Sequence, residues 1–186
     1  MAQAQGLLGK AVNLVPNPSA TGWDLQAEFG IALPPKLADL ARSTPLYFVL
    51  DWQMRRPRWY WRDQRLAQGQ IYWRFSHNSL TQQWRVSTGT SPNIGEGRFA
   101  QTFYSLDEAL STMRRIRRDS LVQSSELQAN QKYDLSVRLR LDTTQLPKPF
   151  QINAITNNDW ALDSGVLEWV FIAAAPVSAM VPVLPK

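Results

Sequence analysis

The chain contains no cysteine and only one histidine, His77. Without thiols it can have no disulfide framework, no thiol nucleophile and no thiolate metal site. A single histidine would leave a transition-metal site to carboxylates, which are a poor donor set for such metals. No apolar run reaches the ~18 residues of a membrane-spanning helix. We therefore expect no metal, no cofactor and no transmembrane helix.

Arginine and tryptophan are the residues that the chain has in plenty. The formal net charge is +5, and most of the 20 positive side chains are arginines. Guanidinium groups favour planar, bidentate and stacked contacts, which suit an anionic partner such as nucleic acid, acidic lipid or an acidic protein face. Eight tryptophans in 186 residues exceed what a core of this size needs. Because each indole N–H needs a hydrogen-bond partner, we expect several tryptophans to lie half-exposed.

Apolar residues alternate with polar ones along much of the chain, as in half-buried β-strands. The clearest examples are 45–55 and 133–141. Further strands are predicted over 23–29, 70–76, 82–87, 98–103 and 166–172, with 77–81 as a hairpin loop. Because strands do not alternate with helices, we predict a mainly β fold with α+β character. It would be an antiparallel, sandwich-like sheet of about seven strands with two short helices.

Two segments have helical patterns. Residues 34–42 begin with two prolines and carry apolar residues at helical spacing. Ser105 and Glu108 have the spacing of a capping box, and an apolar stripe follows as far as Ile116. The arginines at 114, 115, 117 and 118 would then lie near the C-terminal end of this helix, where positive charge suits the helix dipole. We interpret them as a solvated face.

One domain accounts for most of the chain. Residues 1–22 are interpreted as an irregular lead-in, 23–172 as a single β-rich domain, and 173–186 as a loose tail. The first residues, Met-Ala-Gln-Ala-Gln, lack the basic and apolar regions of a signal peptide. They fit a cytoplasmic protein, and equally the mature end of an exported one.

A dense cluster of arginines and aromatics ends the strand predicted over 45–55. We call its members the arginine–aromatic block: Arg55, Arg56, Arg58, Trp59, Tyr60 and Trp61. Its rings could stack on bases while its guanidinium groups pair with phosphates, or the same residues could anchor a protein partner. The structural alternative is that arginine stems cover aromatic rings within the sheet, without a ligand. Among ligands, we favour a protein over nucleic acid.

Catalytic patterns are weak. His77 lies in a predicted hairpin loop, with no sequence sign of the serine and carboxylate that a triad requires. Two carboxylates suffice for glycoside cleavage, and the candidates are Asp51, Asp63, Asp142, Asp159 and Asp163. Asp142 and Asp159 are also typical turn residues, and arginines flank Asp63. The glycine-rich stretch 89–97 lacks the Lys-Ser/Thr ending of a phosphate loop. We assign no catalytic residue.

Three segments resemble one known family. They are Thr44-Pro-Leu-Tyr-Phe-Val-Leu-Asp51 followed by Arg56-Pro-Arg-Trp-Tyr-Trp61, then Trp84-Arg-Val-Ser-Thr-Gly89, and finally 139–154 with its Leu-Pro-Lys-Pro-Phe-Gln motif followed by Asp159-Trp160. Over about residues 23–172, the chain is similar to a proteobacterial family of unknown function called DUF4390. The loop over 90–98 looks longer than is usual in that family.

The resemblance implies export, because members of the family typically carry a signal peptide. It therefore implies a periplasmic location with the signal peptide removed. Genes of the family often neighbour one for a membrane sensor histidine kinase, which implies an envelope or membrane protein as the partner. No activity is established for the family.

We therefore expect a non-enzymatic module, accessory to a two-component system, that binds its partner through the arginine–aromatic block together with Lys148, Asp159 and Trp160. The alternatives are a protein that binds or hydrolyses cell-wall glycan, a small-ligand binding protein, and a nucleic-acid binder.

Overall fold

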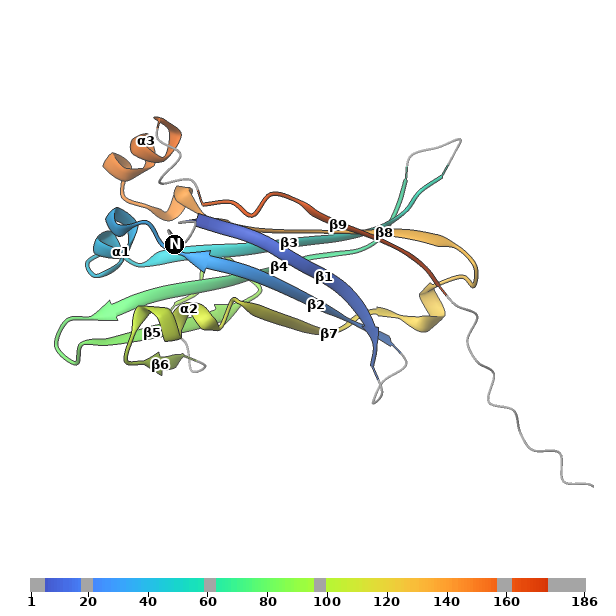
Figure 1. Cartoon of the computed structure of the whole chain (residues 1–186), viewed down its shortest axis with the longest axis horizontal. Coiled ribbons are helices and arrows are strands. Elements are labelled where there is room, and N and C mark those ends of the chain that lie inside the picture. The colour runs from blue at the N-terminus through green and yellow to red at the C-terminus, as the bar shows by residue number, and fades with distance from the viewer. Residues whose placement is uncertain (1–5, 18–21, 59–62, 96–99, 157–161, 174–186) are drawn as a thin grey trace, which may run out of the picture.

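The protein is described by a computed structural model that covers residues 6–17, 22–58, 63–95, 100–156 and 162–173, without the side chains of 153–156 (Figure 1). Its strands are β1 (Gly6–Pro16), β2 (Gly22–Ala32), β3 (Leu46–Arg56), β4 (Gln64–Asn78), β5 (Gln83–Gly89), β6 (Gln101–Phe103), β7 (Arg115–Gln123), β8 (Lys132–Leu141) and β9 (Leu167–Ile172). The helices are α1 (Pro35–Ala41), α2 (Leu106–Ser111) and α3 (Lys148–Thr156), with single 3₁₀ turns η1 (Ser124–Glu126) and η2 (Thr143–Gln145). None of the described helices is long and apolar enough to cross a bilayer.

The strands form two antiparallel sheets. The larger has six strands in the order β6-β5-β4-β3-β8-β9, and the smaller has three in the order β1-β2-β7. Figure 1 shows β1 and β2 running along the larger sheet, and the contacts agree: β1 approaches β8 and β9, while β7 approaches β4. The fold is therefore a sandwich whose larger sheet has an inner face toward the smaller sheet and an outer face on the opposite side.

Alternation along the central strands builds the core. In β3, Leu46, Phe48, Leu50 and Met54 are completely buried, and β8 buries every second residue from Tyr133 to Leu141. Phe48 and Phe75 meet edge to face, with ring centroids 5.6 Å apart. Each fully buried Leu or Phe side chain contributes about 1.5–3 kcal/mol before the cost of ordering it. The apolar positions of the alternating pattern in β3 and β8 thus lie on the inner face of the larger sheet.

The predicted fold class is confirmed: the chain is mostly antiparallel β in two sheets with short helices. The strands predicted over 23–29, 45–55, 70–76, 82–87, 98–103, 133–141 and 166–172 all have counterparts, and α1 lies where 34–42 predicted it. At the start of α2 the Ser105 hydroxyl accepts a hydrogen bond from the Glu108 amide. The Glu108 carboxylate accepts from the amide of Tyr104, one residue before the N-cap, and not from the amide of Ser105. One of the two hydrogen bonds of the predicted capping box is therefore present.

The irregular lead-in predicted over 1–22 is wrong for its largest part. Residues Gly6–Pro16 form β1, which pairs along its length with β2 and buries Leu7, Val12 and Leu14. The register shifts between Gly9 and Ala11, so the inward-facing residues change from one side of the alternation to the other. A period of two cannot be followed across such a bulge, and the sequence pattern therefore missed the strand.

The second helix is shorter than its apolar stripe predicted. It ends at Ser111, and the chain then enters β7, so Ile116 is buried from a strand and Arg115, Arg117 and Arg118 project from that strand. Pairing with β2 overrides the helical spacing here. Helix α3 was not predicted. Of the tail, Ala173 is buried, and residues 174–186 lie outside the described part.

Candidate groove on the outer face of the six-stranded sheet

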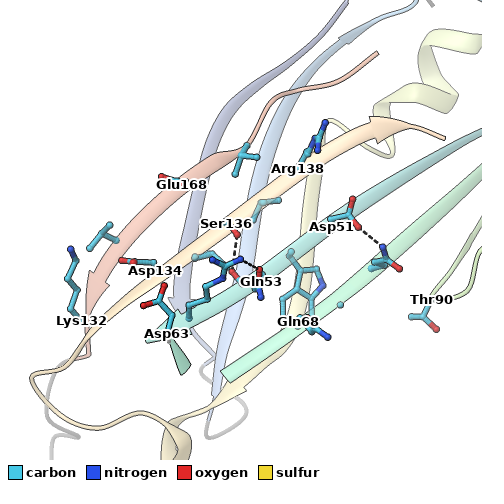
Figure 2. A pocket seen from close by; sticks show the side chains of 18 residues that line it. Asp51, Gln53, Asp63, Gln68, Thr90, Lys132, Asp134, Ser136, Arg138 and Glu168 are labelled. Atoms are coloured by element: carbon cyan, nitrogen blue, oxygen red, sulfur yellow. Dashed lines mark hydrogen bonds between the residues drawn. The ribbon is translucent and has the colours of Figure 1, made fainter. Parts of the chain in front are cut away.

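A broad groove crosses the outer face of the larger sheet at the end where β3 finishes. Its volume is about 1130 Å³, and Figure 2 shows polar and charged side chains from β3, β4, β8 and β9 gathered around it. The charged residues that line it are Asp51, Arg55, Asp63, Lys132, Asp134, Arg138 and Glu168. Since they come from strands far apart in the sequence, only the folded sheet brings them together.

The same alternation that builds the core aims these side chains outward. Asp51, Gln53 and Arg55 are the polar positions of β3, and they face Arg138, Ser136 and Asp134 respectively across the β3–β8 ladder. Cross-strand neighbours on one face lie about 5 Å apart at Cβ. The floor of the groove is therefore a ladder of alternating charges with a polar pair between them.

Two of the lining charges are already neutralised within the protein. The Asp51 carboxylate accepts hydrogen bonds from Arg140 Nε at 3.1 Å and from Gln70 Nε2 at 2.5 Å. The Arg138 guanidinium forms a two-pronged ion pair with Asp163. Hydrogen bonds from Arg138 hold the pKa of the Asp163 carboxyl below its usual value, and the same pair raises the pKa of Arg138. The first pair joins β8 to β3, and the second joins β8 to the segment before β9.

The opposite end of the groove holds charges that are not neutralised. Asp134 Oδ1 is buried and has no hydrogen-bond partner within the described residues. Lys132 and Glu168 are exposed and form no ion pair within that same part of the chain. Among the described residues, the Arg55 guanidinium donates to Gln53 Oε1 alone, at 2.6 Å. These groups gain most from a ligand that supplies the missing partners.

One tryptophan lies beside the groove on β3. The half-buried Trp52 lies directly opposite Gly69 in the β3–β4 ladder, and its ring covers the glycine so closely that a Cβ there would lie 2.6 Å from Cζ2. Trp52 alternates with Asp51 and Gln53, so its indole projects toward the core, against which it packs, although the residue also lines the groove. The expectation of half-exposed tryptophans holds for Trp52, Trp23 and Trp169.

The arginine–aromatic block lies only partly within the described residues. Arg55 lines the groove, Arg56 donates to Gln131 Oε1 at 3.3 Å, and Arg58 donates to Gln64 Oε1 and, from its amide, weakly to Asp63. The Arg56 contact joins the end of β3 to the residue before β8, and the Arg58 contacts join the segment after β3 to the start of β4. Trp59, Tyr60, Trp61, Asp159 and Trp160 lie outside the described residues.

Lys148 is not brought to this site. It is the exposed first residue of α3, which follows η2, and the turn leading into η2 is fixed to the start of β3 by a hydrogen bond from Asp142 N to Tyr47 O. Arg55 and Arg56 lie at the other end of that strand. Figure 1 shows α3 at one end of the sandwich and the end of β3 at the other. A single partner contacting both would have to span the length of β3.

The remaining sequence candidates have structural partners. Asp142 caps η2 by accepting from the amide and hydroxyl of Thr144. His77 is on β4 rather than in a loop, and its ring packs on Trp84 with centroids 4.8 Å apart. No three side chains of the His, Asp and Glu type converge as a metal site in the described part of the chain.

Sequence reasoning missed Lys132, Asp134, Ser136, Arg138 and Glu168 as groove residues. In the alternation predicted over 133–141, Asp134, Ser136 and Arg138 are simply the polar positions, which every half-buried strand has. The signal that could have singled them out is the pairing of β8 with β3, because this pairing places them beside Arg55.

The family model described as "Domain of unknown function (DUF4390)" matches residues 10–170, and the chain belongs to this family. The match starts within β1 and ends within β9, so it contains nearly all of the sandwich. Neither a curated protein nor a solved structure matches the chain.

Proposed function

We propose that this protein is a non-catalytic binding module of the periplasm that docks an envelope or membrane protein on the outer face of its six-stranded sheet. The contact surface is the groove together with Arg55, Arg56 and Arg58 at its end. The proposal rests mainly on one observation: this groove holds charged side chains that no other described residue neutralises.

The shape of the groove supports a protein ligand. Small-molecule sites bury most of their ligand in an enclosed, largely apolar pocket of about 300–1,000 Å³. This groove is larger, lies on a sheet surface and is lined mainly by charged and amide side chains. An extended segment or loop of a partner fits such a floor, because its own charges can pair with the alternating charges along β8.

The charges support specificity more than raw affinity. Arg55 and Lys132 offer positive groups, while Asp134, Glu168 and Asp63 offer negative ones. A partner must therefore present both signs in a fixed order, and a wrong order brings like charges together. Arginine is well suited to anchor such a contact.

The resemblance to the family supports the proposed location and class of partner. Export is typical of DUF4390 proteins, and the neighbouring sensor-kinase genes make the extracytoplasmic part of a membrane histidine kinase the candidate partner. Export is tested separately: protease should digest the native protein in spheroplasts and spare it in intact cells.

Docking is tested with a photo-crosslinking amino acid placed at Ser136 on the groove floor and, as control, at Leu80, which is 93% exposed on the β4–β5 loop. In cells of the native host we expect a discrete adduct from position 136 only. The captured protein is then purified, and its affinity is measured for wild type and for Arg55→Glu.

We expect Arg55→Glu to weaken that affinity by at least about tenfold, since it reverses the charge beside Asp134. Lys148→Glu is the matched control, because it changes net charge equally at the far end of the sandwich. No adduct from the groove, or equal loss of affinity in both variants, contradicts the proposed docking surface.

A cell-wall glycan is the second candidate, and Trp52 is the observation that favours it. Trp52 is among the residues that line the groove and its indole is half-exposed, as a sugar-stacking ring would be, although it projects from the side of β3 opposite to Asp51 and Gln53. Calorimetric titration with soluble peptidoglycan fragments tests this candidate. Binding that disappears in Trp52→Ala, while the variant remains folded, would replace the protein partner by a glycan.

A further inference from the structure

The outer edge of β9 is open. This strand closes one side of the six-stranded sheet and, within the described chain, pairs only with β8. Ala173 N donates to Gln131 O at 3.1 Å, so the backbone groups of Ala173 face β8. The same then holds for every second residue before it in β9, namely Phe171, Trp169 and Leu167. Since hydrogen-bonded pairs alternate along antiparallel strands, the backbone groups of Glu168, Val170 and Ile172 point away from β8. They present donors and acceptors for one more strand.

The other three outermost strands are protected. β6 has only three residues, β1 carries the bulge at Lys10 and ends at Pro16, and β7 carries exposed arginines and a positive φ at Ser120. Short strands, bulges, prolines and charges all prevent edge-to-edge pairing. β9 has none of these apart from Glu168.

The open edge is also apolar. Val170 is 52% exposed and Ile172 is 68% exposed, on the face opposite the core. Val166, just before the strand, is exposed as well. Apolar side chains on an unpaired strand are costly to leave in water, and a bound strand would cover them.

We propose that β9 pairs with β9 of a second copy of this chain. The two strands are antiparallel, and the two-fold axis that relates them passes midway between the two copies of Val170. Val170 then lies opposite Val170 of the other copy, and Glu168 lies opposite Ile172. The two six-stranded sheets become one continuous sheet.

This inference does not depend on the groove's ligand, but it uses Lys132 and Glu168, which also line the groove. In the dimer, Arg55, Asp63 and Asp134 are the charges that remain for the groove's partner.

Charge selects this register. Lys132 lies beside Ile172 in the β8–β9 ladder, so Glu168 of the second copy arrives one strand beyond it. The Cα atoms of Lys132 and that Glu168 are roughly 10 Å apart, two strand spacings, which extended Lys and Glu side chains can bridge. The two-fold axis makes this ion pair twice.

Registers shifted toward Glu168 bring like charges together, and a register shifted toward Ile172 moves the Glu168 carboxylate of the second copy away from Lys132. A two-fold axis through Trp169 would place the second Glu168 opposite Val170 and hence beside Asp134. An axis through Glu168 itself would set the two carboxylates opposite each other. The register centred on Val170 avoids both contacts and gives a partner to Lys132 and Glu168, which form no ion pair within the described part of one chain.

The test is a pair of charge reversals measured by sedimentation velocity. Wild type should dimerise, while Lys132→Glu and Glu168→Lys should each weaken the dimer by at least about tenfold. In Lys132→Glu two glutamates meet across the interface, and in Glu168→Lys two lysines meet. An equimolar mixture of the two variants restores both attractive pairs, so a heterodimer should form with affinity near that of wild type.

Recovery in the mixture also shows that neither variant has lost its fold. Lys148→Glu, an equal change of charge on α3, is expected to leave the dimer intact. Val170→Pro removes the central donor from the open edge without touching the β8 ladder and should abolish pairing. A monomeric wild type at several hundred micromolar, single reversals without effect, or a mixture that stays monomeric would each overturn the proposal.

Discussion

Asp24 is the residue on which the smaller sheet depends most visibly. Its side chain is fully buried, and it accepts hydrogen bonds from the amide of Ser120 at 2.9 Å, from Arg117 Nη2 at 2.7 Å and from Asn17 Nδ2 at 2.9 Å. It lies where the β2–β7 register shifts, and it satisfies a backbone N–H that the ladder cannot. A buried carboxylate here replaces missing strand pairing.

The pKa of Asp24 sets an acid limit on stability. The Ser120 amide, with Arg117 and Asn17 in addition, holds the pKa of the carboxyl below its usual value, and burial opposes them only in part. Because the folded pKa is depressed, the stabilisation is complete above the unfolded value of about 4 and is lost as pH falls through the folded pKa. The same direction holds for Asp163.

We therefore expect the urea midpoint of wild type to stay level from pH 7 to about 5 and to fall below pH 4. Asp24→Asn should lower the midpoint at pH 7 and flatten the decline in acid, with a Tm loss of roughly 5 °C or more at neutral pH. Asp119→Asn removes the exposed acid from the same arginine and is the control. An equal effect of the two changes would contradict the role of burial.

At the scale of elements, β3 and β4 are joined by one unusually close packing contact, between Trp52 and Gly69. β4 has 15 residues and continues past β5, so its first half is an edge over which the Trp52 ring folds. A residue with a side chain at position 69 would displace the indole from the margin of the core, where Trp52 packs. A glycine is thus required at position 69 because of packing against Trp52, and not because of a turn.

Gly69→Ala should destabilise the protein by about 1–3 kcal/mol, the usual cost of overpacking. The natural control is Gly95→Ala, because a Cβ at that position meets nothing within 4 Å. Denaturant unfolding followed by tryptophan fluorescence measures both the stability and the environment of the indole. A neutral Gly69→Ala would show that Trp52 can move away without loss.

At the scale of the whole molecule, β1 turns a two-stranded ribbon into a sheet that can cover the larger one. It buries Leu7, Val12 and Leu14, and Gly9 approaches β9 so closely that a Cβ would lie 2.6 Å from Leu167. The N-terminal segment therefore belongs to the cooperative unit. Small sheets need three or more strands with a covered face to be stable.

Val12→Ser should lower the free energy of unfolding by about 2–3 kcal/mol, because it removes apolar burial and introduces a hydroxyl. Leu8→Ser on the same strand should change it by no more than about 0.5 kcal/mol, since Leu8 is 61% exposed. Thermal and urea unfolding of both variants provide the comparison. Equal tolerance at the two positions would mean that β1 is dispensable.

The sequence by itself determined most of the strands (β2 to β6, β8 and β9), which face of the central ones is buried, and where α1 and α2 begin. These features depend on alternation, proline position and a capping serine, all of which act within a few residues. The strands β3 and β8 were therefore predictable residue by residue.

Only the tertiary structure decided the rest. β1 and β7 exist because β2 pairs with both, across register shifts that break the local period. The groove exists because β8 lies beside β3, and the open edge exists because nothing pairs beyond β9 in the described chain. Strand order and register depend on contacts between residues far apart in sequence, whose energies no local pattern records.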